Sequence, residues 1–228
     1  MPVRISEQEI GKAAQRVDLA VVGAFAPGPE DGAPAHVRTL VLLGPSGAGM
    51  WREFSASDEY SDGAPDPLDR WSRRVISDLA DELGAEALFP FGGPPYQPFI
   101  RWASRAEPAF ASPVGMQVSR TRGLWGSYRG ALGFRAAVGI TPRTTDSPCL
   151  ECPAPCLSAC PVDAFVGGRY DVPACVSHLD TPEGTGCMDG CLVRAACPFG
   201  ARHAPPPEQL NFHMRAFLAN QLRKQAGG

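Results

Sequence analysis

Cysteine is absent from most of this chain: its 228 residues contain eight cysteines, and all of them fall between residues 149 and 197. Long apolar runs are lacking too, and none approaches the roughly 20 residues that a membrane-spanning helix requires. The opening residues 1–7 (MPVRISE) contain no apolar stretch of the kind that a secretory signal needs. We therefore expect a soluble, cytoplasmic protein with no membrane partner, in a reducing compartment that suits free thiols.

Several catalytic patterns are also missing. Residues 44–49 (GPSGAG) follow an apolar strand signal, but Met50 and Trp51 stand where a phosphate-binding loop needs lysine and a hydroxyl residue. We interpret this segment as a turn. The four histidines show no mutual metal-binding spacing, and no Ser/His/Asp set or catalytic carboxylate pair can be recognised. The sequence therefore assigns no catalytic residue.

The eight cysteines form two runs, and each run ends in Cys-Pro. The first follows C-x2-C-x3-C-x3-C-P over residues 149–161, the second follows C-x3-C-x5-C-P over residues 187–198, and Cys175 lies between them. Eight thiols match two four-iron clusters with four thiolates each, and in proteins with two such clusters the cysteine before proline ligates the other cluster. The predicted ligands of the first cluster are Cys149, Cys152, Cys156 and Cys197, and those of the second are Cys160, Cys175, Cys187 and Cys191.

Other interpretations of the cysteines stay open. A disulfide framework would need an oxidising compartment. Two zinc sites would fit the C-x2-C spacing, although the paired Cys-Pro endings favour iron–sulfur. Cys175 could be a buried free thiol, which would leave one cluster with three protein ligands. His178, three residues further on, could replace it, although thiolate is the commoner ligand.

Charge is unevenly distributed, although the net charge is only −3. Residues 1–100 carry 8 basic and 15 acidic residues, and residues 149–197 carry two arginines and six acidic residues. Residues 101–143 carry seven arginines and Glu107 alone, which suggests an anionic partner such as a phosphate-bearing cofactor. The arginines could equally face the acidic segments of the same chain. They are Arg101, Arg105, Arg120, Arg122, Arg129, Arg135 and Arg143.

Helix and strand signals mix without a regular βαβ pattern, which predicts the α+β class. Helices are expected over residues 5–16, where Ser6 and Glu9 form a capping box, and from Pro67 to Gly84, where apolar residues recur every three or four positions. The expected strands cover residues 17–25, 37–43, 114–118 and 131–140, the last two around a turn at Arg122-Gly123. Residues 89–99 are expected to form an aromatic, proline-rich loop, and residues 208–224 a closing helix. The expected parts are residues 1–143, 144–204 and 205–228.

Residues 123–130 (GLWGSYRG) are the second informative stretch. Three glycines would let the backbone approach a flat molecule closely, and Trp125 and Tyr128 could pack on that molecule. A hairpin with core aromatic residues is the competing interpretation.

The cysteine module resembles the iron–sulfur domain of epoxyqueuosine reductase and of corrinoid-dependent reductive dehalogenases, in which a comparable first run is followed by a lone cysteine and a second run. Residues 114–125 (VGMQVSRTRGLW) are similar to the segment before their clusters, and this region also looks like part of the cobalamin-processing chaperone. The resemblance implies a flavin-reductase-like (nitroreductase-type) domain that binds a corrinoid, followed by a bacterial two-[4Fe–4S] ferredoxin-like module. The implied corrinoid-binding residues are Gly123, Leu124, Trp125, Tyr128, Arg129 and Tyr96.

The chain departs from these families at identifiable positions. Both cysteine runs are longer than usual, and Ser119-Arg120 replaces a His-Pro pair of the segment before the clusters. The chain also has no counterpart of the Asp-Ser-Ala-Pro stretch that supplies the catalytic acid in epoxyqueuosine reductase. These differences argue against queuosine chemistry and are compatible with corrinoid binding.

We therefore predict an oxidoreductase that takes electrons from a redox partner protein and delivers them to a bound corrinoid, reducing cobalt(II) to cobalt(I). Two alternatives stay open. One is a plain ferredoxin-type electron carrier without a corrinoid, and the other is a corrinoid-assisted reductase of another organic substrate. Nucleic acid is not expected among the partners.

Overall fold

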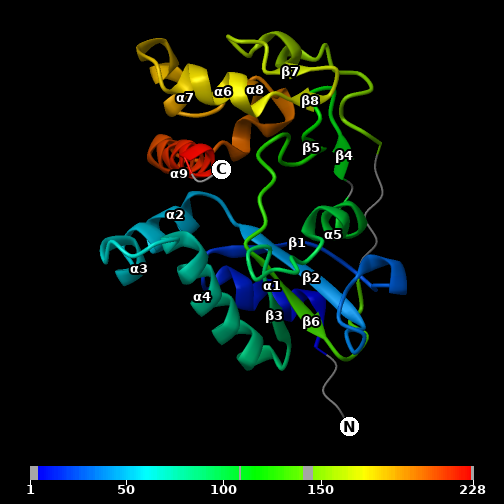
Figure 1. Cartoon of the computed structure of the whole chain (residues 1–228). Coiled ribbons are helices and arrows are strands. Elements are labelled where there is room, and N and C mark those ends of the chain that lie inside the picture. Colours follow the sequence, from blue (N-terminus) through cyan, green and yellow to red (C-terminus); the bar gives the residue numbers. More distant parts are fainter. Residues whose placement is uncertain (1–4, 108, 141–145, 227–228) are drawn as a thin grey trace. The chain divides into compact units, whose positions relative to one another are not determined.

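The computed structural model describes residues 5–107, 109–140 and 146–226, and within it the chain divides into two compact units (Figure 1). Unit 1 contains residues 1–108 and 127–144, and unit 2 contains residues 109–126 and 145–228. Residues 109–126, which we had grouped with the front domain, thus lie in the same unit as the cysteines. The expected boundary at residues 143 and 144, and Arg143 itself, fall outside the described residues.

Unit 1 is built on an antiparallel sheet of four strands in the order β1-β2-β6-β3. Both faces are covered: Leu40 and Leu42 pack with Trp102 of helix α5, and the alternating residues Val41 and Leu43, also fully buried, point to the opposite face. The strands are β1 (Leu19–Phe25), β2 (Thr39–Pro45), β3 (Glu86–Leu88) and β6 (Gly130–Phe134), and α5 covers Phe99–Ala106.

Strand β1 approaches α5 very closely. A side-chain carbon at Gly23 would lie 2.2 Å from the carbonyl oxygen of Ala106, so only glycine fits at this position. The register between β1 and β2 shifts between Val21 and Gly23, as expected for a bulge. This close approach brings the end of α5 directly onto the sheet.

Two helices of unit 1 form as their sequence signals predict. Helix α1 (Glu7–Gln15) has the capping box: the Glu9 amide donates to the Ser6 hydroxyl at 3.2 Å, and the Ser6 amide donates to the Glu9 carboxylate at 2.8 Å. Helix α4 (Pro67–Leu83) ends at Gly84, whose φ of +64° suits glycine. Asp66 precedes α4 but does not cap it, because its own φ is +52° and its side chain makes no capping bond.

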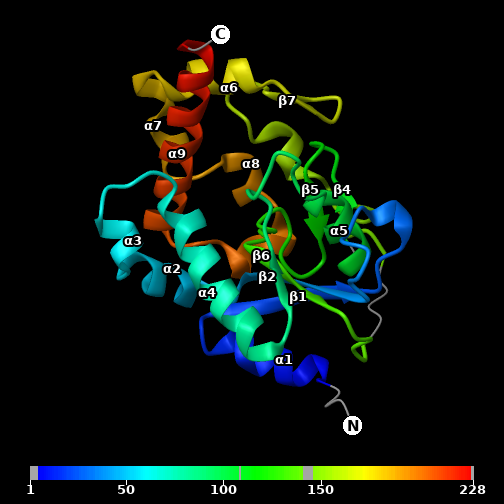
Figure 2. The same ribbon diagram turned by 60° about the horizontal axis from the view of Figure 1, so that its bottom comes forward.

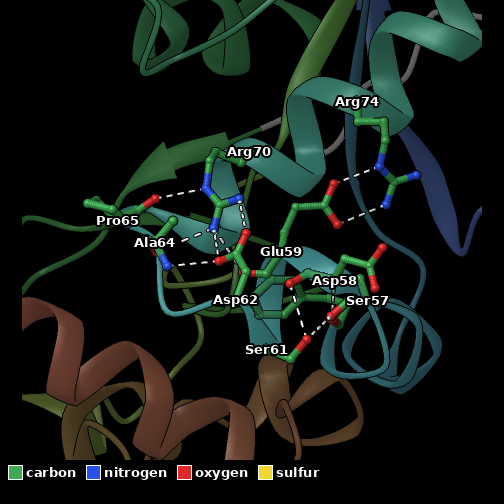
Figure 3. Close-up of polar contacts among 10 residues, drawn as sticks. Ser57, Asp58, Glu59, Ser61, Asp62, Ala64, Pro65, Arg70 and Arg74 are labelled. Atoms are coloured by element: carbon green, nitrogen blue, oxygen red, sulfur yellow. Dashed lines mark hydrogen bonds and ion pairs between the residues drawn. The ribbon is translucent and has the colours of Figure 1, made fainter.

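Figure 3 shows how arginines of α4 hold the short helix α3 (Asp58–Ser61), which follows α2 (Ala48–Ser55). Arg70 donates two bonds of 2.7 Å to the Asp62 carboxylate, and Arg74 donates bonds of 2.6 and 3.0 Å to Glu59. The hydrogen bond from Arg74 lowers the pKa of Glu59 to about 2. These pairs fix the chain between α2 and α4.

The segment 44–49 is a strand end that runs into a helix rather than an isolated turn. A side-chain carbon at Gly49 would lie 1.9 Å from an Asp18 carboxylate oxygen, and the Ser46 hydroxyl donates to the Asp18 carbonyl at 2.9 Å. The carboxylate of Asp18 thus occupies the start of α2, where an anionic ligand would have to lie.

Unit 2 consists of short elements. Strands β4 (Ala109–Ala111) and β5 (Gln117–Ser119) form one antiparallel pair, and β7 (Phe165–Val166) and β8 (Arg169–Tyr170) form another. In both views, helices α6, α7 and α9 lie side by side (Figures 1 and 2). The helices are α6 (Val172–Leu179), α7 (Thr185–Met188), α8 (Leu192–Ala195) and α9 (Pro207–Ala226). The 3-10 turns are η2 (Pro155–Ser158), η3 (Pro182–Gly184) and η4 (Pro198–His203) in unit 2 and η1 (Pro29–Asp31) in unit 1.

The expected hairpin around Arg122-Gly123 is wrong. Ser119 and Gly123 bond to each other through both backbone groups, at 3.1 and 2.9 Å, which closes a tight turn directly after β5. The next strand, β6, pairs with β2 and β3 of unit 1, whereas β5 pairs with β4 of unit 2. Two neighbouring strand signals therefore belong to two different sheets.

Within the described part of the chain, no helix has both the length and the apolar character that crossing a membrane would require. The cytoplasmic location stays a prediction.

Candidate metal centres

Four of the eight thiols gather around one pocket of unit 2. Cys149, Cys152, Cys156 and Cys197 line it together with apolar side chains, and they are the four residues that the sequence assigned to the first cluster. Burial raises the pKa of Cys149 and Cys156, and the neighbouring thiols of the same set add to both shifts because like charges repel. The apolar lining includes Pro113, Val118, Leu124, Ala154, Pro155 and Phe199.

Local backbone geometry turns this first set inward. The Cys152 amide donates to the Cys149 carbonyl at 3.4 Å, and Ala154 then adopts a φ of +53° before η2 begins. Cys156 lies in η2 and is only 7 % exposed, and Cys197 immediately precedes η4 and is 6 % exposed. The Cys149 thiol also has a hydrogen bond to Ser147.

The other four thiols form a second set. Burial raises the pKa of Cys175, and the nearby charges of Cys191 and Cys160 raise it further. The pKa of Cys187 is raised in the same way, by burial and then by Cys191, Cys175 and Cys160. Cys175 is therefore a member of a group and not an isolated thiol.

The second set comes from separate short elements. Cys175 lies in α6, whose start is capped by a 2.9 Å bond from the Ala174 amide to the Asp171 carboxylate. Cys187 lies in α7, and Cys191 immediately precedes α8. Cys160 lies in the chain after η2, where its sulfur accepts a hydrogen bond from the Ala164 amide at 3.3 Å.

Two polar side chains that the sequence did not single out adjoin the second set. The Tyr170 hydroxyl hydrogen-bonds the Cys175 thiol, and its ring stacks on Phe165 at 4.5 Å. Arg194 donates to the Leu124 carbonyl at 2.8 Å; burial lowers its pKa, and the charge of Cys191 opposes that shift. The position of Arg194 between Cys191 and Cys197 was a signal that could have drawn attention to it. Tyr170 carried no comparable signal.

His178 lies one turn after Cys175 in α6. Its Nε2 is buried and has no hydrogen-bond partner among the described residues. It therefore stays an alternative ligand for the corner that we assigned to Cys175.

The donor set fits two four-iron clusters. All eight cysteines are free thiols, and six of them belong to or pack against one apolar core; the exceptions are Cys152 and Cys187. Among the described residues, no three His, Cys, Asp or Glu side chains are arranged to hold a single metal ion. A four-iron cluster makes a different demand, because each thiolate binds a different iron atom and the sulfurs consequently stand further apart.

The residues implied for a corrinoid site divide between the two units. Gly123 has a φ of +54°, and a side-chain carbon there would lie 2.4 Å from the Gly200 amide and 2.9 Å from the Cys197 sulfur. Leu124 is buried in the core beside Cys156. Trp125 packs on Gly200, where an added side-chain carbon would lie 2.8 Å from the indole ring. This stretch thus forms a wall next to the first thiol set.

The remaining implied residues lie in unit 1, where two of them have polar partners. Arg129 donates to Asp69 at 2.6 Å and to the Ser72 hydroxyl at 2.9 Å, and burial lowers its pKa. The Tyr128 hydroxyl donates to Glu107 at 3.4 Å. Tyr96 is 66 % exposed.

The arginine-rich segment is at least partly neutralised within the chain. Arg105 pairs with Glu30 and Asp31, and Arg129 pairs with Asp69. For these two arginines the intramolecular interpretation of the charge pattern is the one that the structure shows. Arg120 is exposed, donates to the Asp146 carbonyl at 3.4 Å and lies over the Phe199 ring at 5.8 Å.

No family model and no curated protein matches this chain. Among solved structures, epoxyqueuosine reductase from Streptococcus thermophilus is similar, with a TM-score of 0.57 at 13 % identity over 92 % of this chain and 70 % of that one. An epoxyqueuosine reductase with an epoxyqueuosine-modified tRNA-Tyr stem loop gives a TM-score of 0.52 at 14 % identity, over 89 % of this chain and 69 % of that one. This chain has the fold of epoxyqueuosine reductase. The mixed α+β class is thereby confirmed, and the nitroreductase-type and ferredoxin-like assignments stay predictions.

The expectation that excluded nucleic acid as a partner needs correction. An epoxyqueuosine reductase of this fold was solved together with an epoxyqueuosine-modified tRNA stem loop, so nucleic acid belongs among the partners to be considered. The sequence argument failed because it treated the arginine-rich segment only as a site for a small phosphate-bearing cofactor. Phosphate groups in RNA attract the same side chains.

Proposed function

We propose that this chain is an iron–sulfur oxidoreductase that holds two [4Fe–4S] clusters in unit 2. One observation supports the proposal: Cys197 lines one pocket together with Cys149, Cys152 and Cys156, and Cys160 is among the thiols whose charge raises the pKa of Cys175 and Cys187. The solved neighbours of this fold are reductases, which supports the same class.

When bound, such clusters accept and release single electrons at potentials of roughly −700 to +450 mV, depending on their surroundings. The protein supplies the ligands and the environment. Cys156 and Cys197 anchor the first site from the buried side of unit 2. Phe165, Leu124 and Val193 fill the shared core around the thiols and exclude water from it.

The first experiment measures metal content in anaerobically purified full-length protein. We expect about eight iron and eight sulfide per chain, at four of each per cluster. Cys175→Ala should retain the signal of the first cluster and lose or convert the second. Ser158→Ala, which removes an exposed hydroxyl of η2, is the matched control and should retain full iron content. Zinc in place of iron would refute the proposal, and full iron in Cys175→Ala would assign its corner to His178 or a non-protein ligand.

As the electron acceptor we propose a corrinoid bound against Trp125. The support is local: this indole packs on Gly200, close in sequence to the ligand Cys197, and its ring is only partly buried. Leu124 would act indirectly, because its side chain is packed inside the core of unit 2.

A cobalamin titration followed by absorbance tests this acceptor. Unmodified protein should bind with a dissociation constant below about 100 μM. Trp125→Ala should weaken binding several-fold while iron content stays at eight. Tyr60→Ala, which changes a partly exposed tyrosine of unit 1, should bind normally. If unmodified protein does not bind in this range, the electron-carrier alternative takes over.

A second candidate substrate class is RNA, because the related epoxyqueuosine reductase was solved with a tRNA stem loop. Fluorescence anisotropy with such a stem loop should show binding that weakens as salt rises, since phosphate contacts release counterions. Arg105→Gln should change the affinity little, because this guanidinium is already neutralised by Glu30 and Asp31. Binding that does not depend on salt would exclude this candidate.

A further inference from the structure

The two thiol sets have different electrostatic surroundings. Arg194 comes directly after the Cys191 segment, in α8, and is partly buried. Its one hydrogen bond goes to the Leu124 carbonyl, and within the described residues it has no carboxylate partner. Burial lowers the pKa of Arg194, and the Cys191 thiolate opposes that shift. A partly buried guanidinium without a carboxylate needs an anion, and the second thiol set is the anion that the structure offers.

Solvent exposure differs in the same direction. In the first set, Cys156 and Cys197 are buried, and the pocket is lined mainly by proline, alanine, leucine, valine and phenylalanine. In the second set, all four cysteines are partly exposed. Reduction adds negative charge to a site that is already anionic, so burial in apolar surroundings opposes reduction more at the first set.

Neutral hydrogen-bond donors adjoin both sets, and only the second set has a cation nearby as well. Within the part of the chain that the structure describes, the buried Ser112 hydroxyl has no hydrogen-bond partner, and it lines the first pocket. The second set receives the Tyr170 hydroxyl and the Ala164 amide in addition to the nearby cation. The charge of Arg194 acts on an anionic site over a longer range than the dipole of a neutral hydroxyl does, so Arg194 outweighs Ser112.

We infer that the cluster on Cys160, Cys175, Cys187 and Cys191 has the less negative reduction potential of the two, and that Arg194 is the positioning charge that sets this order. The inference rests on the proposed function, because it requires both clusters. A fixed positive charge and hydrogen bonds to sulfur stabilise the reduced form and so raise the potential. The first electron to enter the protein therefore settles at this second set.

The experiment is a redox titration of the full-length, two-cluster protein followed by electron paramagnetic resonance. Two midpoints should be resolved. In Arg194→Gln the higher midpoint should move to more negative potential, with the lower one nearly unchanged. Arg194→Lys, which keeps the charge, should retain most of the wild-type value. Arg169→Gln, which removes an exposed arginine of unit 2, is the control and should leave both midpoints in place.

Tyr170→Phe keeps the inference testable if Arg194→Gln does not fold. It removes the hydrogen bond to Cys175 and keeps the ring that stacks on Phe165, so the same midpoint should move in the same direction by a smaller amount. The inference is overturned if the lower midpoint shifts, or if neither variant shifts a midpoint, while the iron content stays at eight per chain. The proposed function would still stand in that case. Protein that binds no iron refutes both.

Discussion

Unit 1 and unit 2 are stabilised in different ways. Unit 1 has a four-stranded sheet with strands of up to seven residues, and its core is aliphatic and aromatic. The strands of unit 2 have only two or three residues, and its core includes most of the thiols. A unit with little regular structure and with thiols in its core depends for its stability on the metal that those thiols bind.

The thiol pKa values express the same difference. Burial raises the pKa of Cys149, Cys156, Cys175 and Cys187, so each of these thiols resists ionisation in the absence of metal. Metal ligation requires the thiolate, and the free energy of binding must offset that cost. The core of unit 1 contains no ionisable group of this kind among its described residues.

The largest expected effect is that of iron removal. Anaerobic chelation should unfold unit 2, because structural metal sites contribute free energy on the order of 10 kcal/mol. Hydrogen exchange measured by mass spectrometry should show loss of protection in α6 and α8, with β2 and β6 still protected. Equal loss of protection in both units would mean that they unfold cooperatively. It would contradict the claim that only unit 2 depends on its metal for stability.

A cavity in unit 1 should give the opposite result. Leu42→Ala removes a fully buried side chain beside Trp102, and we expect a loss of about 2–5 kcal/mol in the free energy of unfolding of unit 1. Chemical denaturation followed by fluorescence measures it, and iron content should stay at the wild-type level. Leu157→Ala is the control, because Leu157 is 50 % exposed and its loss should change stability by less than about 0.5 kcal/mol. Loss of iron in Leu42→Ala would contradict this independence.

The smallest expected effect concerns the pH dependence of unit 1. The pKa of Glu59 is about 2 in the folded protein, below its ordinary value of 4.5, so its pairing with Arg74 stabilises the fold above pH 4.5 and is lost as the pH falls towards 2. Glu59→Gln should therefore flatten the stability curve between these pH values and cost less than about 1 kcal/mol at pH 7, because Arg74 is half-exposed. If the free energy of unfolding of the variant falls between pH 4.5 and 2 as steeply as that of the wild type, the pair contributes nothing to stability.

Sequence reasoning succeeded where one local pattern determines the structure. The capping box of α1 and the Pro67 start and Gly84 end of α4 are local signals, and each element forms where its signal lies. The exchange of Cys-Pro ligands between the two runs, which the cysteine spacing also indicates, stays a prediction.

Sequence reasoning failed where strand pairing depends on residues that are far apart in the chain. Residues 114–118 and 131–140 both carry strand signals, but a short apolar segment does not indicate which strand it will pair with. In the structure, β5 and β6 belong to different sheets. Arg194 and Ser112 were missed for a related reason. Among the described residues, Arg194 has no carboxylate partner and the Ser112 hydroxyl has no hydrogen-bond partner, and these properties exist only once the surrounding elements are in place.

Residues 109–126 belong to unit 2, whereas the segments before and after them belong to unit 1. The two units therefore become complete at different times during synthesis. Strand β6 lies between β2 and β3, so the sheet has a gap until residues 130–134 have left the ribosome. By then the β4–β5 pair is already present, and the thiols of its own unit are still to be synthesised. The nascent chain therefore completes the sheet of unit 1 before the rest of unit 2 has been synthesised. A gene truncated after residue 143 would encode residues 109–126 without the rest of the unit 2 core.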